Sequence, residues 1–299
     1  MWLQFDTEAK YHSVQNCDQE EQKPMKKLTA LALAFSLSLT LAMGLGATAT
    51  AIESDGIDVI VNDAAIPMDV PAQVWDQVTY VSYWPVVQAL YPDATAVWQN
   101  DRSIVTAAGL TMEIQPGLSY FVVNGRYLYL PQGIKTSGNV LLLPARSLGA
   151  ALGADVAWDA MGGNVVFTAG SGPITSGSIA YQEDVVYWLS HIINAESGNQ
   201  PLAGKIAVGN VVLNRVASPR FPNTVYEVIF QRGQFTPVSN GSIHLTPNAE
   251  SVIAAKLCLD GANTVGNAIY FLNPRYSPNS WAARTKTHVA TIGAHAFYQ

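Results

Sequence analysis

Charged residues and cysteine are both scarce in this chain. Only 13% of its 299 residues are charged, and it contains two cysteines, Cys17 and Cys258. The only adjacent basic residues are Lys26 and Lys27, and the formal net charge is −6 at pH 7. Without a basic patch to match a phosphate backbone, nucleic acid is disfavoured as a partner. Because 49% of the residues are hydrophobic, the chain has the material for packed cores and is not disordered or fibrous.

The segment 25–51 has the form of a secretion signal. A lysine pair is followed by the uncharged run 28–45 and then by small residues, of which Ala49 and Ala51 fit an A-x-A cleavage site. A membrane anchor is the alternative, since the run approaches the roughly 20 residues that span a bilayer. The hydroxyl residues and glycines of the run favour the signal, so we expect an exported protein, secreted or held in the cell envelope.

The residues before Met25 do not resemble the start of a signal, which favours translation from Met25 over Met1. In either case residues 1–51, an upstream extension and the signal, are expected to be absent from the mature chain. Cys17 is lost with them, and Cys258 is left without a partner for a disulfide. In its apolar surroundings Cys258 is expected to pack as a small hydrophobic residue.

A change of composition near residue 170 divides the rest of the chain. Glycine, serine and proline at 170–178 are typical of a linker. We therefore predict a module at 52–170, a linker at 171–180 and a second domain at 181–299. Residues 52–177 carry 11 acidic and four basic side chains, whereas residues 178–299 carry six acidic and eight basic ones. The net charge thus hides an acidic module beside a slightly basic domain.

The predicted module contains an internal repeat at a spacing near 60 residues, in which the segment from Val81 parallels the segment from Leu143. Each copy predicts a β-hairpin, a short amphipathic helix, a strand that ends in Trp98 or Trp158, and a second hairpin. The first hairpins are expected at Asn62-Asp63 and Asn124-Gly125, and the second at 99–101 and 159–163. The fold class predicted for residues 52–170 is therefore a duplicated α+β unit.

The motifs VNG, LLLPARSLGAALGADVAWD and NVVFTAG resemble the copper amine oxidase N-terminal-like domain. This resemblance implies a non-catalytic role, such as attachment to a cell wall. Residues 52–177 contain no histidine or cysteine, the ligands that copper favours, so no metal is expected there. The tryptophans of this module are expected to be strand and core residues rather than platforms for sugars. They are Trp75, Trp84, Trp98 and Trp158.

Residues 183–195 predict a helix with one apolar face and with acids in its first turn. Gly198 is expected to end this helix, and a second helix is expected to begin at Pro201. Glu196 then lies at a helix C-terminus beside an apolar helical pair. Both the helix dipole and burial disfavour its ionised form, so a raised pKa is expected. Such a carboxylic acid can protonate a glycosidic oxygen near neutral pH.

The longer string from WLSHIINAESGNQPLAGKIAVGNVVLNRV through GQFTPVSNGSI and GNAIYFLNP to IGAHAFY resembles the SleB-type cell-wall hydrolases, the spore cortex-lytic enzymes. The resemblance covers residues 181–299 and implies a mainly α, lysozyme-like catalytic domain with a small β element. It also implies cleavage of peptidoglycan by a lytic transglycosylase whose catalytic residue is Glu196. Many members have a second glutamate four positions later, but this chain has Gln200 there.

A lytic transglycosylase does not need the second carboxylate, because the C6 hydroxyl of muramic acid replaces water as the nucleophile. Glu196 would act as general acid and then as base, leaving a 1,6-anhydro end. By resemblance, Gln234, Phe235, Tyr270 and Asn273 line the sugar groove, and neither a metal nor another cofactor is expected. His295 is expected to be a hydrogen-bonded structural residue, while Glu227 and Glu250 are expected on solvated faces.

Several alternatives remain open on the sequence. A hydrolase of the muramidase type differs only in that water attacks, and an inactive wall-binding protein would explain the missing carboxylate. A zinc amidase or a serine or cysteine peptidase is disfavoured, since the histidines form no compact ligand pair and no nucleophile motif occurs. We expect a monomer whose partner is peptidoglycan, either of the spore cortex, with a role in germination, or of the vegetative wall.

Overall fold

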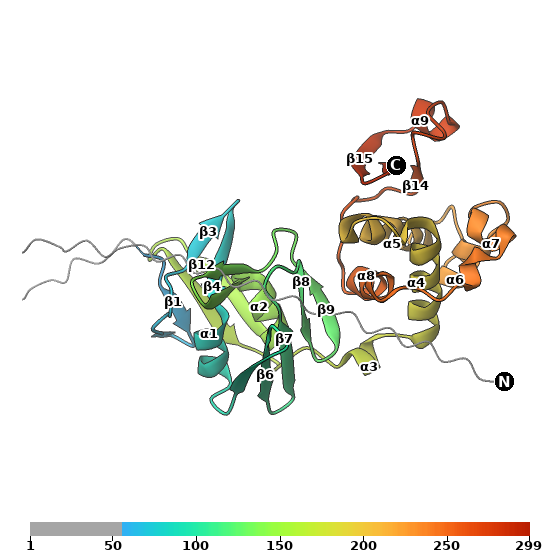
Figure 1. Cartoon of the computed structure of the whole chain (residues 1–299). Coiled ribbons are helices and arrows are strands. Elements are labelled where there is room, and N and C mark those ends of the chain that lie inside the picture. The colour runs from blue at the N-terminus through green and yellow to red at the C-terminus, as the bar shows by residue number, and fades with distance from the viewer. Residues whose placement is uncertain (1–55) are drawn as a thin grey trace, which may run out of the picture. The chain divides into compact units, whose positions relative to one another are not determined.

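The computed structural model describes residues 56–299 (Figure 1). The expected signal at 25–51 and the extension before it lie outside these described residues. Within them, no helix is both long enough and apolar enough to cross a bilayer. Strands dominate up to residue 169 and helices dominate after it, which confirms the predicted α+β class.

The strand-rich part comprises thirteen strands and two helices among the described residues. The strands are β1 (Val59–Val61), β2 (Ala64–Ala65), β3 (Gln73–Trp75), β4 (Val78–Ser82), β5 (Thr95–Gln99), β6 (Arg102–Ala107), β7 (Leu110–Ile114), β8 (Tyr120–Val123), β9 (Arg126–Tyr129), β10 (Lys135–Ser137), β11 (Val140–Pro144), β12 (Ala154–Asp159) and β13 (Asn164–Ala169). The helices are α1 (Tyr83–Leu90) and α2 (Ala145–Leu152).

The predicted duplication is confirmed by the elements. Val78 begins β4 and Val140 begins β11, 62 residues later, and the helices α1 and α2 follow these strands directly. The expected hairpins are present. Their turns at Asn62-Asp63 and Asn124-Gly125 have positive φ at both residues, as a two-residue hairpin with a type I′ turn requires.

The two copies exchange their first hairpins. The hairpin β1–β2 of the first copy joins β12–β13 of the second in a sheet with the order β12-β13-β1-β2. The hairpin β8–β9 of the second copy joins β5–β6 of the first through β7. Between these sheets, β4 pairs antiparallel with β11, and Val81 lies opposite its repeat equivalent Leu143. A pseudo-twofold axis therefore passes between these two residues.

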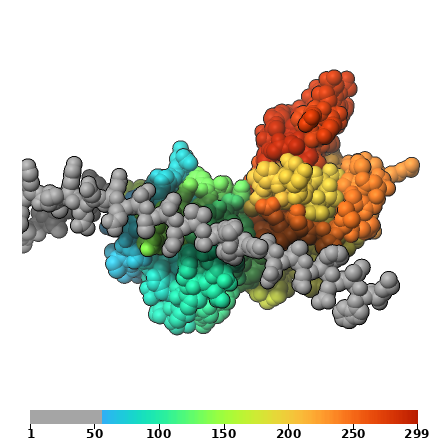
Figure 2. Space-filling model, viewed as in Figure 1, coloured from blue at the N-terminus to red at the C-terminus, as the bar shows by residue number. Residues whose placement is uncertain are grey.

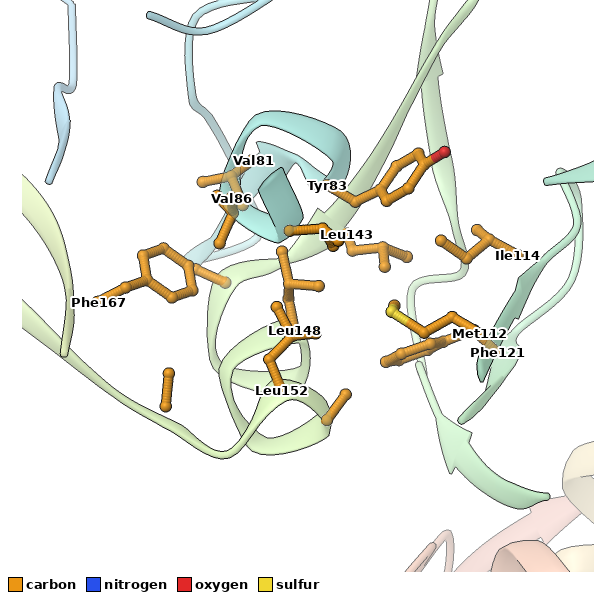
Figure 3. Close-up of a cluster of buried hydrophobic side chains, with 14 of the residues drawn as sticks. Val81, Tyr83, Val86, Met112, Ile114, Phe121, Leu143, Leu148, Leu152 and Phe167 are labelled. Atoms are coloured by element: carbon orange, nitrogen blue, oxygen red, sulfur yellow. The ribbon is translucent and has the colours of Figure 1, made fainter. Parts of the chain in front are cut away.

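Both repeat helices bury their apolar faces in one hydrophobic cluster. In Figure 3, Leu148 of α2 lies between Phe167 and the pair Met112 and Phe121. All four side chains are at most 1% exposed. Burial of each side chain of this size contributes roughly 1.5–3 kcal/mol to stability. Because these side chains come from both copies and share one cluster, the two copies stabilise each other.

The remaining elements form the mainly helical part. They are α3 (Gly177–Ala180), α4 (Glu183–Ser197), α5 (Leu202–Val216), α6 (Val225–Phe230), α7 (Thr236–Asn240), the 3₁₀ helix η1 (Ser242–His244), α8 (Ala249–Leu259), β14 (Tyr270–Leu272), α9 (Trp281–Thr285), β15 (His288–Ile292) and β16 (His295–Tyr298). The three strands form a small sheet in the order β14-β16-β15. This sheet contacts α5 and, with α9, forms a lobe beside it (Figures 1 and 2).

Helices α4, α5 and α8 pack tightly around Gly209 of α5. A Cβ atom at Gly209 would lie 2.6 Å from Cys258 Sγ and 2.9 Å from Ile193 Cδ1. Glycine therefore allows the close approach of three helices in a second hydrophobic cluster. Cys258 is 4% exposed, and burial raises the pKa of its thiol, which confirms that it packs as a small hydrophobic residue.

Gly198 follows the last residue of α4, as expected, but it does not adopt the left-handed cap conformation. Its φ and ψ are −54° and −26°, in the right-handed region. A Cβ atom there would lie 2.6 Å from the carbonyl oxygen of Asn194. The helix therefore ends where it was predicted to end, and glycine is needed at this position for close approach rather than for positive φ.

Candidate active site

Glu196 is the penultimate residue of α4 and is half-buried. A hydrogen-bond network attaches this end of α4 to the start of α8. Asn194 Oδ1 accepts hydrogen bonds from the backbone N–H of Asn248 (3.1 Å) and from the hydroxyl of Ser251 (3.3 Å). Asn248 Nδ2 donates to the carbonyl oxygen of Gly198 at 3.0 Å. The backbone that carries Glu196 is thus held on both sides.

Burial raises the pKa of Glu196 above its ordinary value, and the positive charge of Arg215 acts in the opposite direction. The C-terminal end of α4, where unpaired carbonyl groups carry partial negative charge, adds to the effect of burial. The raised pKa confirms the expectation drawn from the sequence. Glu196 and Arg215 form no ion pair within 4.0 Å in the described part of the chain.

Arg215 of α5 is the residue around which the site is built, although it was not among the residues predicted from the sequence. It is 5% exposed, and its Nε donates to the carbonyl oxygen of Ile269 at 2.8 Å. The guanidinium carbon lies 5.2, 5.1 and 6.0 Å from the ring centroids of Phe221, Phe235 and Tyr270. Burial lowers the pKa of Arg215 to about 10, so it stays charged at neutral pH.

Two of the residues predicted to line the groove, Phe235 and Tyr270, are therefore brought together by Arg215, which also acts on Glu196. Phe235 is 5% exposed and belongs to the hydrophobic cluster, whereas Tyr270 is half-buried at the start of β14. One signal in the sequence could have revealed Arg215, since it is an isolated cation near the end of the otherwise apolar segment IAVGNVVLNRV.

The other two residues predicted to line the groove, Gln234 and Asn273, differ in their exposure. Gln234 is exposed beside the buried Phe235. Asn273 is half-buried, and its Oδ1 accepts a hydrogen bond from the backbone N–H of Arg275 at 3.0 Å. No hydrogen bond joins either side chain to Glu196 within residues 56–299, and their contact with a substrate stays a prediction.

Gln200, at the position of the absent second carboxylate, has a structural role. Its Oε1 accepts a hydrogen bond from the backbone N–H of Ala294 at 2.8 Å, in the turn between β15 and β16. The backbone carbonyl oxygen of Gln200 accepts a hydrogen bond from Nζ of Lys205 at 2.8 Å. Lys205 is 2% exposed and also pairs with Glu250. Glu250 is thus more than the solvated residue that was expected, because it neutralises a buried ammonium group.

His295 differs from the expected hydrogen-bonded residue. It is 9% exposed, and its ring packs edge-on against Phe271 at a centroid distance of 5.4 Å. Its buried Nδ1 has no hydrogen-bond partner among the described residues. Burial lowers the pKa of His295, so the neutral form is favoured. The residue is held by packing.

No group of three or more histidine, cysteine, aspartate or glutamate side chains within residues 56–299 could hold a metal ion. What the site offers chemically is a single carboxyl group with a raised pKa, a buried cation and aromatic rings.

Comparison with known families gives a match over each part of the chain. Residues 199–298 match the family model described as Cell Wall Hydrolase. This segment is therefore similar to cell wall hydrolases. Residues 50–167 match the model described as Copper amine oxidase N-terminal domain, so both predicted resemblances are confirmed. The cell wall hydrolase match begins at Asn199, three positions after Glu196.

Curated relatives of the cell wall hydrolase segment are spore cortex-lytic enzymes. The enzyme of Bacillus cereus is 38% identical over 117 residues, which are 39% of this chain and 45% of the relative. That of Oceanobacillus iheyensis is 33% identical over 135 residues, which are 45% of this chain and 49% of the relative. The chain thus spans less than half the length of these two relatives.

Two solved structures are similar to the same segment. The catalytic domain of the germination-specific lytic transglycosylase SleB from Bacillus anthracis is 36% identical, and the match covers 42% of this chain and all of that one. The catalytic domain of SleB from Bacillus cereus is 37% identical, with 40% and 92% covered. The TM-score is 0.38 in both cases, which is too low to support a statement about the fold.

Proposed function

We propose that this protein cleaves the glycan strands of peptidoglycan as a lytic transglycosylase in which Glu196 is the catalytic residue. The observation that carries the proposal is the half-buried carboxyl group of Glu196, whose pKa is raised by burial and lowered in part by the charge of Arg215. No second carboxylate lies four positions later, where this chain has Gln200. The names of the relatives support peptidoglycan as the substrate, and those of the solved structures support the reaction type.

In the first step, Glu196 donates its proton to the glycosidic oxygen as the bond from that oxygen to C1 breaks. The sugar then carries positive charge at C1 and its ring oxygen. In the second step, the C6 hydroxyl of the same muramic acid attacks C1 and gives its proton to Glu196. The products are a strand with a free hydroxyl and a strand with a 1,6-anhydro end, and Glu196 is protonated again. No water is consumed.

Arg215 acts in this scheme as a positioning residue. Between the two steps Glu196 is ionised, and a fixed positive charge in a site of low polarity stabilises that form without reorganisation. The aromatic rings of Phe221, Phe235 and Tyr270 hold the guanidinium in place. We further propose that Tyr270 and Asn273 contact the sugar, together with the exposed Gln234, and that Phe235 acts through Arg215.

The substrate proposed is the peptidoglycan of the spore cortex, after the names of the curated relatives. A protein with this substrate acts outside the cytoplasmic membrane, in the cell envelope. This location agrees with the expected secretion signal at 25–51.

The test compares Glu196→Gln with Glu183→Gln, which changes an exposed acid in the first turn of the same helix. Purified cortex peptidoglycan should lose turbidity with the parent and the Glu183 variant, and the Glu196 variant should be slower by at least roughly 100-fold. Mass spectrometry should find 1,6-anhydro ends. Reducing ends in their place would establish the muramidase alternative, and no lysis by the parent would favour an inactive wall-binding protein.

A further inference from the structure

Two surface hollows on the strand-rich module occupy equivalent positions in the two repeats. One, of about 160 Å³, includes Gln77, Val78 and Trp158 among its lining residues. The other, of about 290 Å³, includes Asn139, Val140 and Trp98. Asn139 and Val140 follow Gln77 and Val78 by the 62 residues that separate the repeats. The pseudo-twofold axis therefore relates the two hollows as it relates the strands β4 and β11.

The tryptophan of each hollow is on an edge strand and faces solvent. Trp98 of β5 is 61% exposed and Trp158 of β12 is 47% exposed. Their strand partners, Ser103 and Val165, are again 62 residues apart. Both tryptophans lie on strands, as expected, but the expectation that they belong to the core is wrong. Trp84 packs against the core, as expected, but it lies in α1 rather than on a strand. A large indole is exposed at both equivalent positions, so each hollow presents an aromatic surface that a ligand could cover.

Polar groups accompany each indole. The amide side chains of Gln77 and Asn139 are exposed at equivalent positions, and each can both donate and accept a hydrogen bond. One hollow adds Arg146, and the other adds Asp69 and a second indole, that of Trp84. An aromatic face beside an amide matches a sugar ring, which has an apolar C–H face and hydroxyl or acetamido groups at its edge.

The charge of the module limits the ligand further. Residues 52–177 carry 11 acidic and four basic side chains. Polyanions such as nucleic acid or phosphate-containing wall polymers are repelled by such a surface. A glycan strand of N-acetylated sugars has low charge density and repeats along its length, so it offers the same kind of sugar to each hollow.

We propose that the hollows at Trp98 and Trp158 are two equivalent glycan-binding sites, which hold the protein on a polysaccharide of N-acetylated sugars. The choice of this polysaccharide rests on the proposed function, whereas the existence of the sites rests on the duplicated geometry. Occupation of both sites by one insoluble polymer multiplies the affinity of each, because the second site binds at a high effective concentration.

The experiment uses the full chain with Glu196→Gln, so that binding is measured without cleavage. Co-sedimentation with purified peptidoglycan sacculi is compared for the Trp98→Ala variant, the Trp158→Ala variant and the double variant. Each single change should weaken binding by roughly 3- to 10-fold, and the double change by more than either alone. Val97→Ala is the matched control, since Val97 is 56% exposed on β5 and points to the opposite face of the strand.

Circular dichroism and the melting temperature confirm that each variant is folded. Binding of the double variant equal to that of the Val97 control would overturn the proposal, even if the parent protein lyses sacculi. Conversely, loss of binding in the tryptophan variants supports the two sites even if the parent chain does not cleave the polymer. Chitin and cellulose serve as further probes, and retention on chitin but not on cellulose is the expected result for recognition of acetamido groups.

Discussion

Replacing Gly209 with alanine tests the packing that places Glu196 and Arg215 on adjoining helices. The new methyl group would lie 2.6 Å from Cys258 Sγ and 2.9 Å from Ile193 Cδ1, both below any ordinary contact distance. Overpacking of this kind costs roughly 1–3 kcal/mol. The gain in helix propensity from glycine to alanine, about 1 kcal/mol, opposes it. With two contacts this short, we expect a net loss of about 1–2 kcal/mol.

The size of this effect should depend on residue 258. In a Cys258→Ala background the contact with sulfur is gone and the contact with Ile193 Cδ1 remains, so Gly209→Ala should cost clearly less than in the parent protein. Cys258→Ser retains a smaller atom there, so the loss should be intermediate. Gly204→Ala in the same helix is a further control, because its Cβ would lie no closer than 3.3 Å to any neighbour.

The assay is thermal unfolding followed by circular dichroism, in which a loss of 1–2 kcal/mol corresponds to about 2–8 °C for a protein of this size. Lytic activity is measured below the transition of each variant. If Gly209→Ala lowers the melting temperature equally with cysteine, serine or alanine at position 258, the contact with Sγ is not the cause. Close approach of α5 to α8 is then not what disfavours a side chain at position 209.

Two further predictions concern charges near the site. Arg215→Gln removes the positive charge that lowers the pKa of Glu196, so that pKa should rise and the alkaline limb of the pH profile for lysis should move to higher pH. Arg215→Lys retains the charge and should leave the limb in place, and identical limbs in both variants and the parent would contradict this role. Glu250→Gln leaves the buried ammonium of Lys205 without its carboxylate and should cost about 1–3 kcal/mol in urea unfolding. Lys205→Met combined with Glu250→Gln should recover part of that loss, and a double variant as unstable as the sum of both single changes would show that the pair is not coupled.

Local sequence patterns were sufficient for the repeat and its turns. Paired residues such as Asn62-Asp63 and Asn124-Gly125 tolerate positive φ, and the apolar spacing in 145–152 and 183–197 marks helices. The exchange of hairpins between the copies was not predictable. Val59 of β1 pairs with Val165 of β13, more than 100 residues away, and no local periodicity records that contact.

In the candidate site, only the residue whose role follows from its own local position could be predicted. A lone carboxyl group at a helix end indicated Glu196, and its raised pKa follows from that place. Arg215 was missed because arginine in a helix usually extends its charge into water, and its burial depends on rings from three other segments. Gln200 was considered only as a missing acid, although its amide holds the turn at Ala294.

The exchanged hairpins also bear on how the module could have arisen. A single copy of the repeat would lack the strand pair that completes its own sheet, and it would expose the unpaired edge of β13 or its equivalent. A second molecule could supply the missing strand pair, in a symmetric dimer with swapped hairpins. Fusion of two copies in one gene would make that association independent of protein concentration. It would also free each copy to diverge, as Arg146 at the position of Trp84 illustrates.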